Sequence, residues 1–311
     1  MAARYMNNVL PVLQAWRTEG HATVLATLVA VDGSAPRPRG SQMAIRADGL
    51  AVGNITGGCA EAAIIAEAQA RLAAGSNRLL RFGKGSPYID IRLPCGSGID
   101  VFFDTQFSDR DLALVLAANA ARTPASLVFD FDQLRCEAVA GVVTLDEPAR
   151  WARICEPAIR LHAVGKGPLV PLLAQLGTAA EFEVLVWSSE SETLEMARPH
   201  ALEAHALTTP DAFRCGELDP WTAFVSLFHE HEWDPPLLVQ ALASQCFYVG
   251  ALGSRRTAET RRELLREMGV ADASIARLRG PVGLDLGGRS PPEIAISILG
   301  EIVKVRRKGT G

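Results

Sequence analysis

The sequence has little that would place it in a membrane, on a nucleic acid or in a disulfide-stabilised class. It contains no uninterrupted apolar run long enough to cross a bilayer, and residues 1–16 lack the apolar core and cleavage site of a signal peptide. The net charge is −4, so no overall positive field attracts nucleic acid or an anionic membrane. The six cysteines are scattered, with no CxxC pair. We therefore expect a cytoplasmic protein with reduced thiols that has neither nucleic-acid nor membrane partners.

Apolar residues, by contrast, make up 48% of the 311 residues, which is ample for buried cores, and the length favours two domains. We expect the first, residues 1–150, to be a mixed α/β domain, with a polar, proline-bearing boundary segment at 146–157. Its predicted elements are, in order, a buried strand in 21–33, a hairpin in 41–55, a helix that follows Cys59 and stops at Gly75, a helix over 109–121, and strands in 125–131 and 136–145 that extend the same sheet.

The second domain, residues 158–311, begins with a strand, a glycine turn, a helix that stops at Gly177 and a second strand, which is the order of a βαβ unit. Further strands flank another helix downstream. Near the C-terminus, Ser290 and Glu293 form the capping box of a long helix. The predicted fold class is thus α/β, with an N-terminal mixed α/β domain followed by a Rossmann-like domain that has a mainly parallel sheet.

The stretch GNITGGCAEAAI delivers one cysteine, Cys59, to the start of a predicted helix. Gly57 and Gly58 precede it and permit close approach of the backbone. A helix N-terminus carries partial positive charge and unpaired amides, which favour a thiolate and bind oxyanions. Cys59 is therefore a candidate soft ligand or nucleophile. The alternative is that it is a small buried apolar residue, the commoner fate of a free cysteine.

Two further stretches of the first domain carry candidate ligands. In GSAPRPRG, prolines stiffen a loop that bears Arg37 and Arg39, and guanidinium groups on a rigid loop bind phosphate in bidentate fashion. The alternative is that these arginines are only solubilising. In LPCGSGID, a glycine turn presents Cys95, followed by Gly96. If the fold brings Cys95 to Cys59, the pair could hold a soft or oxo-bearing metal centre.

The second domain offers two candidate anion sites. In VGKGPLV, Gly165 and Gly167 match the first two glycines of a dinucleotide fingerprint, but Val170 stands where the third small residue is needed. The acid that binds a ribose is replaced by the stretch 187–189, so binding of NAD(P) is doubtful, although a phosphate is still compatible with the turn. Further along, Ser254 is a plausible N-cap, and the arginines that follow it, from Arg255, oppose the helix dipole unless an anion binds there.

Five blocks together resemble one family. GSAPRPRGSQMAIRADGLAVGNITGGCAEAA, LPCGSGIDVFF, LHAVGKGPLV, YVGALGSRRT and GPVGLDLGGRSPPEIAISILGEIV follow, in order, the signatures of the xanthine dehydrogenase accessory protein family, XdhC/CoxI. The resemblance implies a chaperone without catalytic residues, not an enzyme. Such a chaperone binds the molybdenum cofactor, protects it during sulfuration and delivers it to a xanthine dehydrogenase-type apoenzyme. It also implies a cysteine desulfurase partner and a homodimer.

Combined with the residue chemistry, the resemblance gives a set of candidate contacts for the molybdenum cofactor, an anionic pterin that carries a molybdenum dithiolene. Cys59 and Cys95 are the candidate molybdenum or sulfur contacts. Two other functions stay open: an NAD(P)-dependent oxidoreductase that uses the Rossmann-like domain, and a structural adaptor for a molybdoenzyme. The predicted cofactor-binding residues are Arg37, Arg39, Gly57, Gly58, Cys59, Cys95, Gly96, Gly165, Gly167, Ser254 and Arg255.

Overall fold

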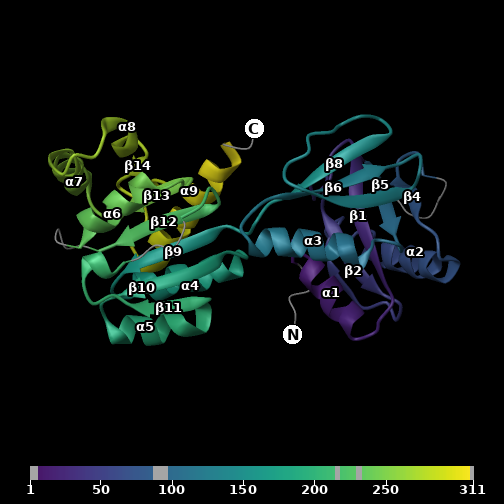
Figure 1. Ribbon diagram of the computed structural model, residues 1–311, viewed down its shortest axis with the longest axis horizontal. Coiled ribbons are helices and arrows are strands. Elements are labelled where there is room, and N and C mark those ends of the chain that lie inside the picture. The colour runs from purple at the N-terminus through teal and green to yellow at the C-terminus, as the bar shows by residue number, and fades with distance from the viewer. Residues whose placement is uncertain (1–5, 87–96, 214–217, 229–232, 309–311) are drawn as a thin grey trace. The chain divides into compact units, whose positions relative to one another are not determined.

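The computed structural model describes residues 6–86, 97–213, 218–228 and 233–308 (Figure 1). The chain divides into two units, Met1–Pro157 and Ala158–Gly311. The first unit is built on antiparallel strands and the second on a six-stranded parallel sheet, so the predicted α/β class is confirmed. None of the helices within these described ranges is long and apolar enough to span a membrane.

A five-stranded antiparallel sheet forms the centre of the first unit. The predicted hairpin is present, because β2 and β3 pair with each other across the turn at 47–49. The strand order is β3-β2-β1-β5-β4. Its strands are β1 (Thr23–Asp32), β2 (Gln42–Arg46), β3 (Ala51–Gly53), β4 (Arg78–Gly83) and β5 (Gly98–Asp104).

The two faces of this sheet are covered differently. Helix α2 (Glu61–Ala74) packs on one face through Ile64 and Ala68. The other face meets α1 (Leu10–Thr18), α3 (Asp109–Ala120) and a second, three-stranded sheet, whose Leu127 and Phe129 join the same core as Phe102. The nearly continuous apolar runs of β1 and β5 are what allow both faces to be buried, since successive side chains point to opposite faces.

The second sheet of the first unit corrects one prediction. It has the order β7-β6-β8, with β6 (Ala125–Asp130), β7 (Arg135–Ala140) and β8 (Arg150–Cys155). The strands in 125–131 and 136–145 therefore do not extend the first sheet, because β6 pairs with β7 and β8 on its two edges. The segment 146–157, where the boundary was predicted, contains β8, and the first unit ends at its last residue, Pro157.

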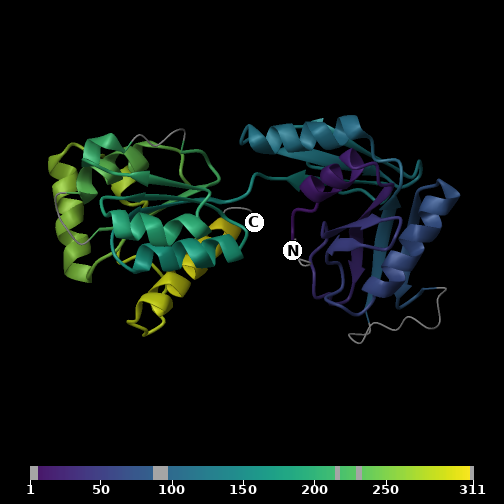
Figure 2. The same ribbon diagram turned by 90° about the horizontal axis from the view of Figure 1, so that it is seen from below.

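The second unit is a parallel sheet with helices on both faces (Figure 2). Helices α4, α5 and α9 share one apolar cluster with the sheet, and α6, α7 and α8 share the other. The strand order is β11-β10-β9-β12-β13-β14. The elements are β9 (Arg160–Gly165), α4 (Leu169–Ala179), β10 (Glu183–Ser188), α5 (Ser191–Ala197), β11 (Glu203–Ala206), β12 (Thr222–Leu227), α6 (Asp234–Ala243), β13 (Tyr248–Ala251), α7 (Arg255–Glu267), α8 (Asp272–Ile275), β14 (Leu278–Arg279) and α9 (Pro291–Lys308), with short 3-10 turns at Arg198–His200 and Pro210–Ala212.

The start of α9 and the end of α4 can be compared with the predictions made from local sequence. The capping box of α9 is confirmed, since the Glu293 carboxylate accepts from the Ser290 amide at 3.0 Å and its hydroxyl at 2.6 Å. Helix α4 does not stop at Gly177 but continues to Ala179. Gly177 instead allows α4 to approach the sheet, because an added Cβ would lie 3.0 Å from Val184. It does the packing that the absent third fingerprint glycine would have done.

Candidate functional site

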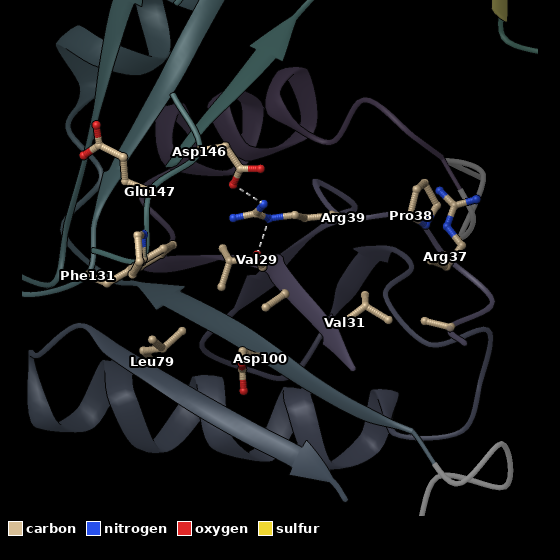
Figure 3. A pocket seen from close by; sticks show the side chains of 13 residues that line it. Val29, Val31, Arg37, Pro38, Arg39, Leu79, Asp100, Phe131, Asp146 and Glu147 are labelled. Carbon is tan, nitrogen blue, oxygen red and sulfur yellow. Dashed lines mark hydrogen bonds and ion pairs between the residues drawn. The ribbon is translucent and has the colours of Figure 1, made fainter. Parts of the chain in front are cut away.

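A pocket of about 770 Å³ lies in the first unit, beside the arginine loop that leaves β1 (Figure 3). The loop lies at one end of it, and Phe131 and Glu147 lie at the other. Its apolar wall comes from strands that also form the core, and its polar groups come from the loop, from the segment before β8 and from β5. The lining residues are Val29, Ala30, Val31, Ala35, Arg37, Pro38, Arg39, Leu79, Asp100, Phe131, Asp146, Glu147 and Pro148.

Arg39 reaches into the middle of this pocket and is held by the protein itself. Its Nε donates to the carbonyl of Val29, and its Nη1 donates to Asp146 at 2.7 Å. The guanidinium carbon lies 4.2 Å from the ring centroid of Trp151. The predicted bidentate phosphate clamp therefore does not fit Arg39, because two of its donor groups are already used.

Arg37 lies at the other end of the loop and is less fully engaged. Its Nη2 donates to the side chain of Asn7. Its Nε is buried and has no hydrogen-bond partner among the residues that the structure describes. Of the two arginines, Arg37 is thus the one with unused capacity to bind an anion.

The Cys59 loop has a different arrangement from the predicted one. Cys59 is exposed and lies before the helix, since Ala60 is the N-cap and Glu61 the first helical residue. Gly57 and Gly58 have φ angles of 76° and 111°, which glycine adopts without strain. Cys59 is therefore neither in the first helical turn nor a buried apolar residue.

The carboxylate of Glu61 accepts from amides of the glycine-rich turn that precedes the helix. It accepts from the amide of Thr56 at 2.7 Å and that of Gly58 at 2.8 Å, and from the Thr56 hydroxyl at 2.5 Å. Burial alone would raise the pKa of Glu61, but these hydrogen bonds outweigh it and lower that pKa below its usual value. The loop is thus ordered around a negative charge of its own, with Cys59 left at the surface.

The arginine loop and the Cys59 loop lie side by side. A Cβ placed on Gly57 would be 3.5 Å from Pro36, the residue between pocket-lining Ala35 and Arg37. The structure thus brings Gly57, at the start of the Cys59 loop, next to the loop that bears Arg37 and Arg39. Cys95 and Gly96 lie outside the described residues, so their predicted approach to Cys59 stays a prediction.

Charged groups at the far end of β1 adjoin the pocket. Arg81 donates to Asp32 at 3.0 Å and to Asp100 at 3.1 Å. Burial raises the pKa of the pocket-lining Asp100 carboxyl, and Asp32 adds to this, while Arg81 opposes both. The Asp100 carboxylate is therefore committed to Arg81, and Figure 3 shows it directed away from Arg39.

The predicted phosphate turn of the second unit is partly filled by side chains. The Gly167 amide donates to the Glu190 carboxylate at 3.1 Å and to the Thr193 hydroxyl at 3.0 Å. Close packing explains why residue 165 is a glycine, because an added Cβ on Gly165 would lie 2.7 Å from Leu227 on the neighbouring strand. A dinucleotide pyrophosphate would have to displace Glu190 from the amide that it needs.

The start of α7 agrees with its predicted cap. The Ser254 hydroxyl accepts from the Thr257 amide at 3.1 Å. Arg255 is exposed, and no ion pair joins it to another described residue. This site lies at the carboxyl edge of the parallel sheet, as does the turn at Gly165, but the two turns follow β13 and β9, which are separated by β12.

Several residues of the pocket were not predicted from the sequence. Asp146, Phe131 and Trp151 are brought to Arg39 by β6 and β8, and no local motif indicates that pairing. Glu61 and Glu190 were also missed as internal acceptors. The signal for Glu61 is its place in the first helical turn after Thr56, where a carboxylate can reach back to free amides.

Metal coordination would need more ligands than these loops supply. No group of three or more His, Cys, Asp or Glu side chains with metal-binding geometry occurs among the described residues. A metal that arrives already bound in an organic ligand is a different case, because it brings most of its coordination with it. Cys59 can then be at most a single additional soft contact.

The fold and the site together define a two-domain protein, with a Rossmann-like second domain and a pocket beside paired arginine and cysteine loops in the first. Two family models match the chain, one described as the XdhC and CoxI family over residues 16–83 and one described as the XdhC Rossmann domain over residues 161–302. The molybdenum cofactor insertion chaperone PaoD of Escherichia coli K12 is 32% identical over 92% of this chain and 84% of its own length. The chain belongs to the XdhC and CoxI family.

Other relatives agree with this placement. A protein of Bacillus subtilis 168 described as a probable xanthine dehydrogenase subunit is 24% identical, and the match covers 97% of this chain and 99% of the relative. The uncharacterised YqeB of Escherichia coli K12 is 28% identical, but the match spans only 44% of that longer protein. A crystal structure of a xanthine dehydrogenase from Bacillus halodurans has a TM-score of 0.80 at 23% identity over 96% of both chains, which shows a shared fold.

Proposed function

We propose that this protein binds the molybdenum cofactor, protects it during sulfuration and delivers it to a xanthine dehydrogenase-type apoenzyme. The observation that carries the proposal is the pocket of the first unit, which combines an apolar wall, an incompletely engaged Arg37 and the adjacent Cys59 loop. The similarity to PaoD supports it, since that relative is a molybdenum cofactor insertion chaperone.

The chemistry of the cargo fits these residues. The cofactor joins a planar pterin, a phosphate and a molybdenum held by a dithiolene, so it needs an apolar slot, a cation and room for a soft contact. The volume of about 770 Å³ lies within the range of small-ligand pockets. We assign the phosphate to Arg37 and the molybdenum end to the Cys59 loop, where the sulfur of Cys59 is exposed. Cys59, and Cys95 beyond the described residues, are the proposed molybdenum or sulfur contacts.

The remaining predicted cofactor contacts have at most minor roles in this proposal. Gly57 and Gly58 shape the Cys59 loop. Gly165, Gly167, Ser254 and Arg255 belong to the second unit, where we expect at most an accessory anion contact. We keep a cysteine desulfurase, which supplies sulfur, and a second copy of this chain as proposed partners.

An oxidoreductase that uses NAD(P) is the alternative, and the parallel sheet alone favours it. The Glu190 carboxylate on the Gly167 amide counts against it, because a pyrophosphate would have to displace that charge. Titration of the protein into NADH distinguishes the two. A change in nicotinamide fluorescence when micromolar protein is added would show that the protein binds NADH and would support the oxidoreductase. No detectable binding of NADH, even at millimolar concentration, would exclude it.

The test of the proposal is the molybdenum and pterin content of the protein purified from cells with an active cofactor pathway. We expect about one cofactor per chain or per dimer in the wild type, and at least a several-fold lower content in Cys59→Ser. Cys246→Ala is the matched control, because Cys246 is buried in the second unit and should not affect loading. Absence of both molybdenum and pterin from the wild type, in cells whose molybdoenzymes are loaded, would refute the proposal.

A further inference from the structure

The guanidinium of Arg39 ends a stack of flat groups that rises from the core into the pocket. Phe129 and Trp151 are stacked, with ring centroids 5.3 Å apart and planes inclined by 23°. Arg39 lies over Trp151 with its guanidinium carbon 4.2 Å from the ring centroid. Phe129 and Trp151 are both buried, so the stack has a fixed base. Its last member is the one that lines the pocket.

Two hydrogen bonds fix the plane of this guanidinium. The Val29 carbonyl accepts from Nε, and Asp146 accepts from Nη1 at 2.7 Å (Figure 3). The side chain nevertheless remains 33% exposed. Because the guanidinium carbon lies over the Trp151 ring, the exposed part of the side chain is the part that Trp151 does not cover. Arg39 therefore presents a rigid, flat, cationic surface to the pocket.

The surroundings of that surface define what can lie on it. Leu79 and Phe131 supply apolar walls nearby. Asp146 uses one carboxylate oxygen for Arg39, while its side chain is 74% exposed, so it can accept a hydrogen bond from a ligand as well. A flat aromatic ring with N–H groups on one edge can stack on the guanidinium of Arg39 and donate hydrogen bonds to the carboxylate of Asp146.

We propose that Arg39 is the stacking platform for the pterin ring of the cargo, and that Asp146 accepts hydrogen bonds from the amino edge of that ring. This inference rests on the proposed function and deepens it. Arginine stacks on aromatic rings through its planar, delocalised cation, and a lysine at the same place keeps the charge without the flat face. The Arg37 end of the pocket remains for the phosphate.

The test uses the full-length chain and two ring probes. 6-Hydroxymethylpterin carries the 2-amino group, and 6-hydroxymethyllumazine carries an oxygen in its place. Fluorescence titration gives the Kd of each ring for the wild type, Arg39→Lys and Asp146→Asn. We expect Arg39→Lys to weaken both rings by about five-fold, since lysine keeps the charge and loses the planar stacking, which is part of a contact that contributes about 1–2 kcal/mol. We expect Asp146→Asn to weaken the pterin selectively and so reduce the preference of the wild type for pterin over lumazine.

Arg46→Lys is the matched control. Arg46 also lies over a tryptophan, Trp16, at 5.6 Å, and pairs with an aspartate, Asp48, in the same unit, but it does not line the pocket. Its replacement should change neither Kd by more than two-fold. Thermal unfolding of each variant shows that the fold persists, and a merely structural role of Asp146 would not change the ratio between the two rings.

The possible results distinguish failure of the Arg39 stacking platform from failure of the proposed function. If the wild type binds neither ring at millimolar concentration, or if Arg39→Lys binds both rings as the wild type does, the platform is overturned. The proposed function still stands in that case if the purified wild type carries molybdenum and pterin. If it carries neither, the proposed function fails whatever the rings do.

Discussion

At the scale of single residues, two arginines of one loop differ because of what each of them contacts. Arg37 and Arg39 are two positions apart in a proline-rich segment, and local sequence treats them alike. Only Arg39 lies over Trp151 and pairs with Asp146, which is 107 residues away along the chain. Arg37 keeps an Nε without an acceptor among the described residues. The contact that distinguishes them is tertiary, so the sequence alone could not assign their roles.

One buried carboxyl makes a residue-scale prediction about pH. Burial raises the pKa of Asp104 to about 6, with hydrogen bonds such as that from the Gln106 amide opposing the change. A carboxyl whose folded pKa exceeds its unfolded value stabilises the fold while protonated, and that stability is lost as pH rises from about 4 to about 6. We expect the wild type to lose about 2 kcal/mol of unfolding free energy over this window from Asp104 alone, out of about 3 kcal/mol for the complete titration.

The measurement is urea-induced unfolding of the wild type and of Asp104→Asn at several values between pH 4 and pH 7. The amide cannot ionise, so the variant should lack this part of the pH dependence. Its curve should lie closest to that of the wild type at the acidic end. Parallel curves for the two proteins over the whole range would show that Asp104 does not titrate in this window.

At the scale of elements, internal carboxylates fill the amide clusters that sequence motifs mark as anion sites. Glu61 does so before α2, and Glu190 does so at the turn after β9. In both places, a glycine-rich turn at a helix start looks from its local sequence like a ligand site. The structure shows that the protein supplies the first anion itself. A ligand near Cys59 must therefore bind beside Glu61 and not in its place.

Glu61 gives a prediction for its own loop. Glu61→Gln removes the charge and one of the two accepting oxygens, so the donors at Thr56 and Gly58 cannot all remain satisfied. We expect amide hydrogen exchange at these two residues to accelerate roughly ten-fold or more, because a lost hydrogen bond to a charged group costs about 1–3 kcal/mol. Exchange measured residue by residue provides the readout.

Glu293→Gln is the comparison variant. Glu293 also accepts at a helix start, but its bonds from the Arg289 and Ser290 amides and from the Ser290 hydroxyl all converge on one oxygen, which an amide side chain retains. Its effect on local exchange should be small, and Thr56 and Gly58 should be unaffected. Equal protection of Thr56 and Gly58 in the wild type and Glu61→Gln would contradict the role of this carboxylate.

The elements that the sequence predicted are those with local signals. The strand in 21–33, the hairpin at 47–49, the βαβ unit and the cap of α9 each follow from periodicity, turn residues or caps. The separate sheet of β6, β7 and β8 was not predictable, because strand partners are chosen by non-local packing. The pocket could not be predicted for the same reason, since β8 and the segment before it supply the contacts of Arg39. Cys59 was placed near its helix, but its exposure and the role of Glu61 needed the loop's full geometry.

At the scale of the whole molecule, an acidic chain can attract an anionic cargo only through local positive charge. The net charge of −4 gives no general attraction for a phosphate, so the phosphate affinity must come from a local cation, which the proposal places at Arg37 in the pocket. A carrier also has to release what it binds. Few cationic contacts and an open loop with exposed Cys59 suit moderate affinity better than permanent retention.

The most direct measurement is transfer of cargo to an acceptor. The full-length protein, purified with its cofactor, is mixed with a cofactor-free xanthine dehydrogenase-type enzyme, the two are separated, and molybdenum and pterin are quantified in each. We predict that both leave this chain and are recovered with the acceptor in equal amounts. If both stay with this chain, while free cofactor loads the same acceptor under the same conditions, the protein is not a delivery chaperone for that class of enzyme.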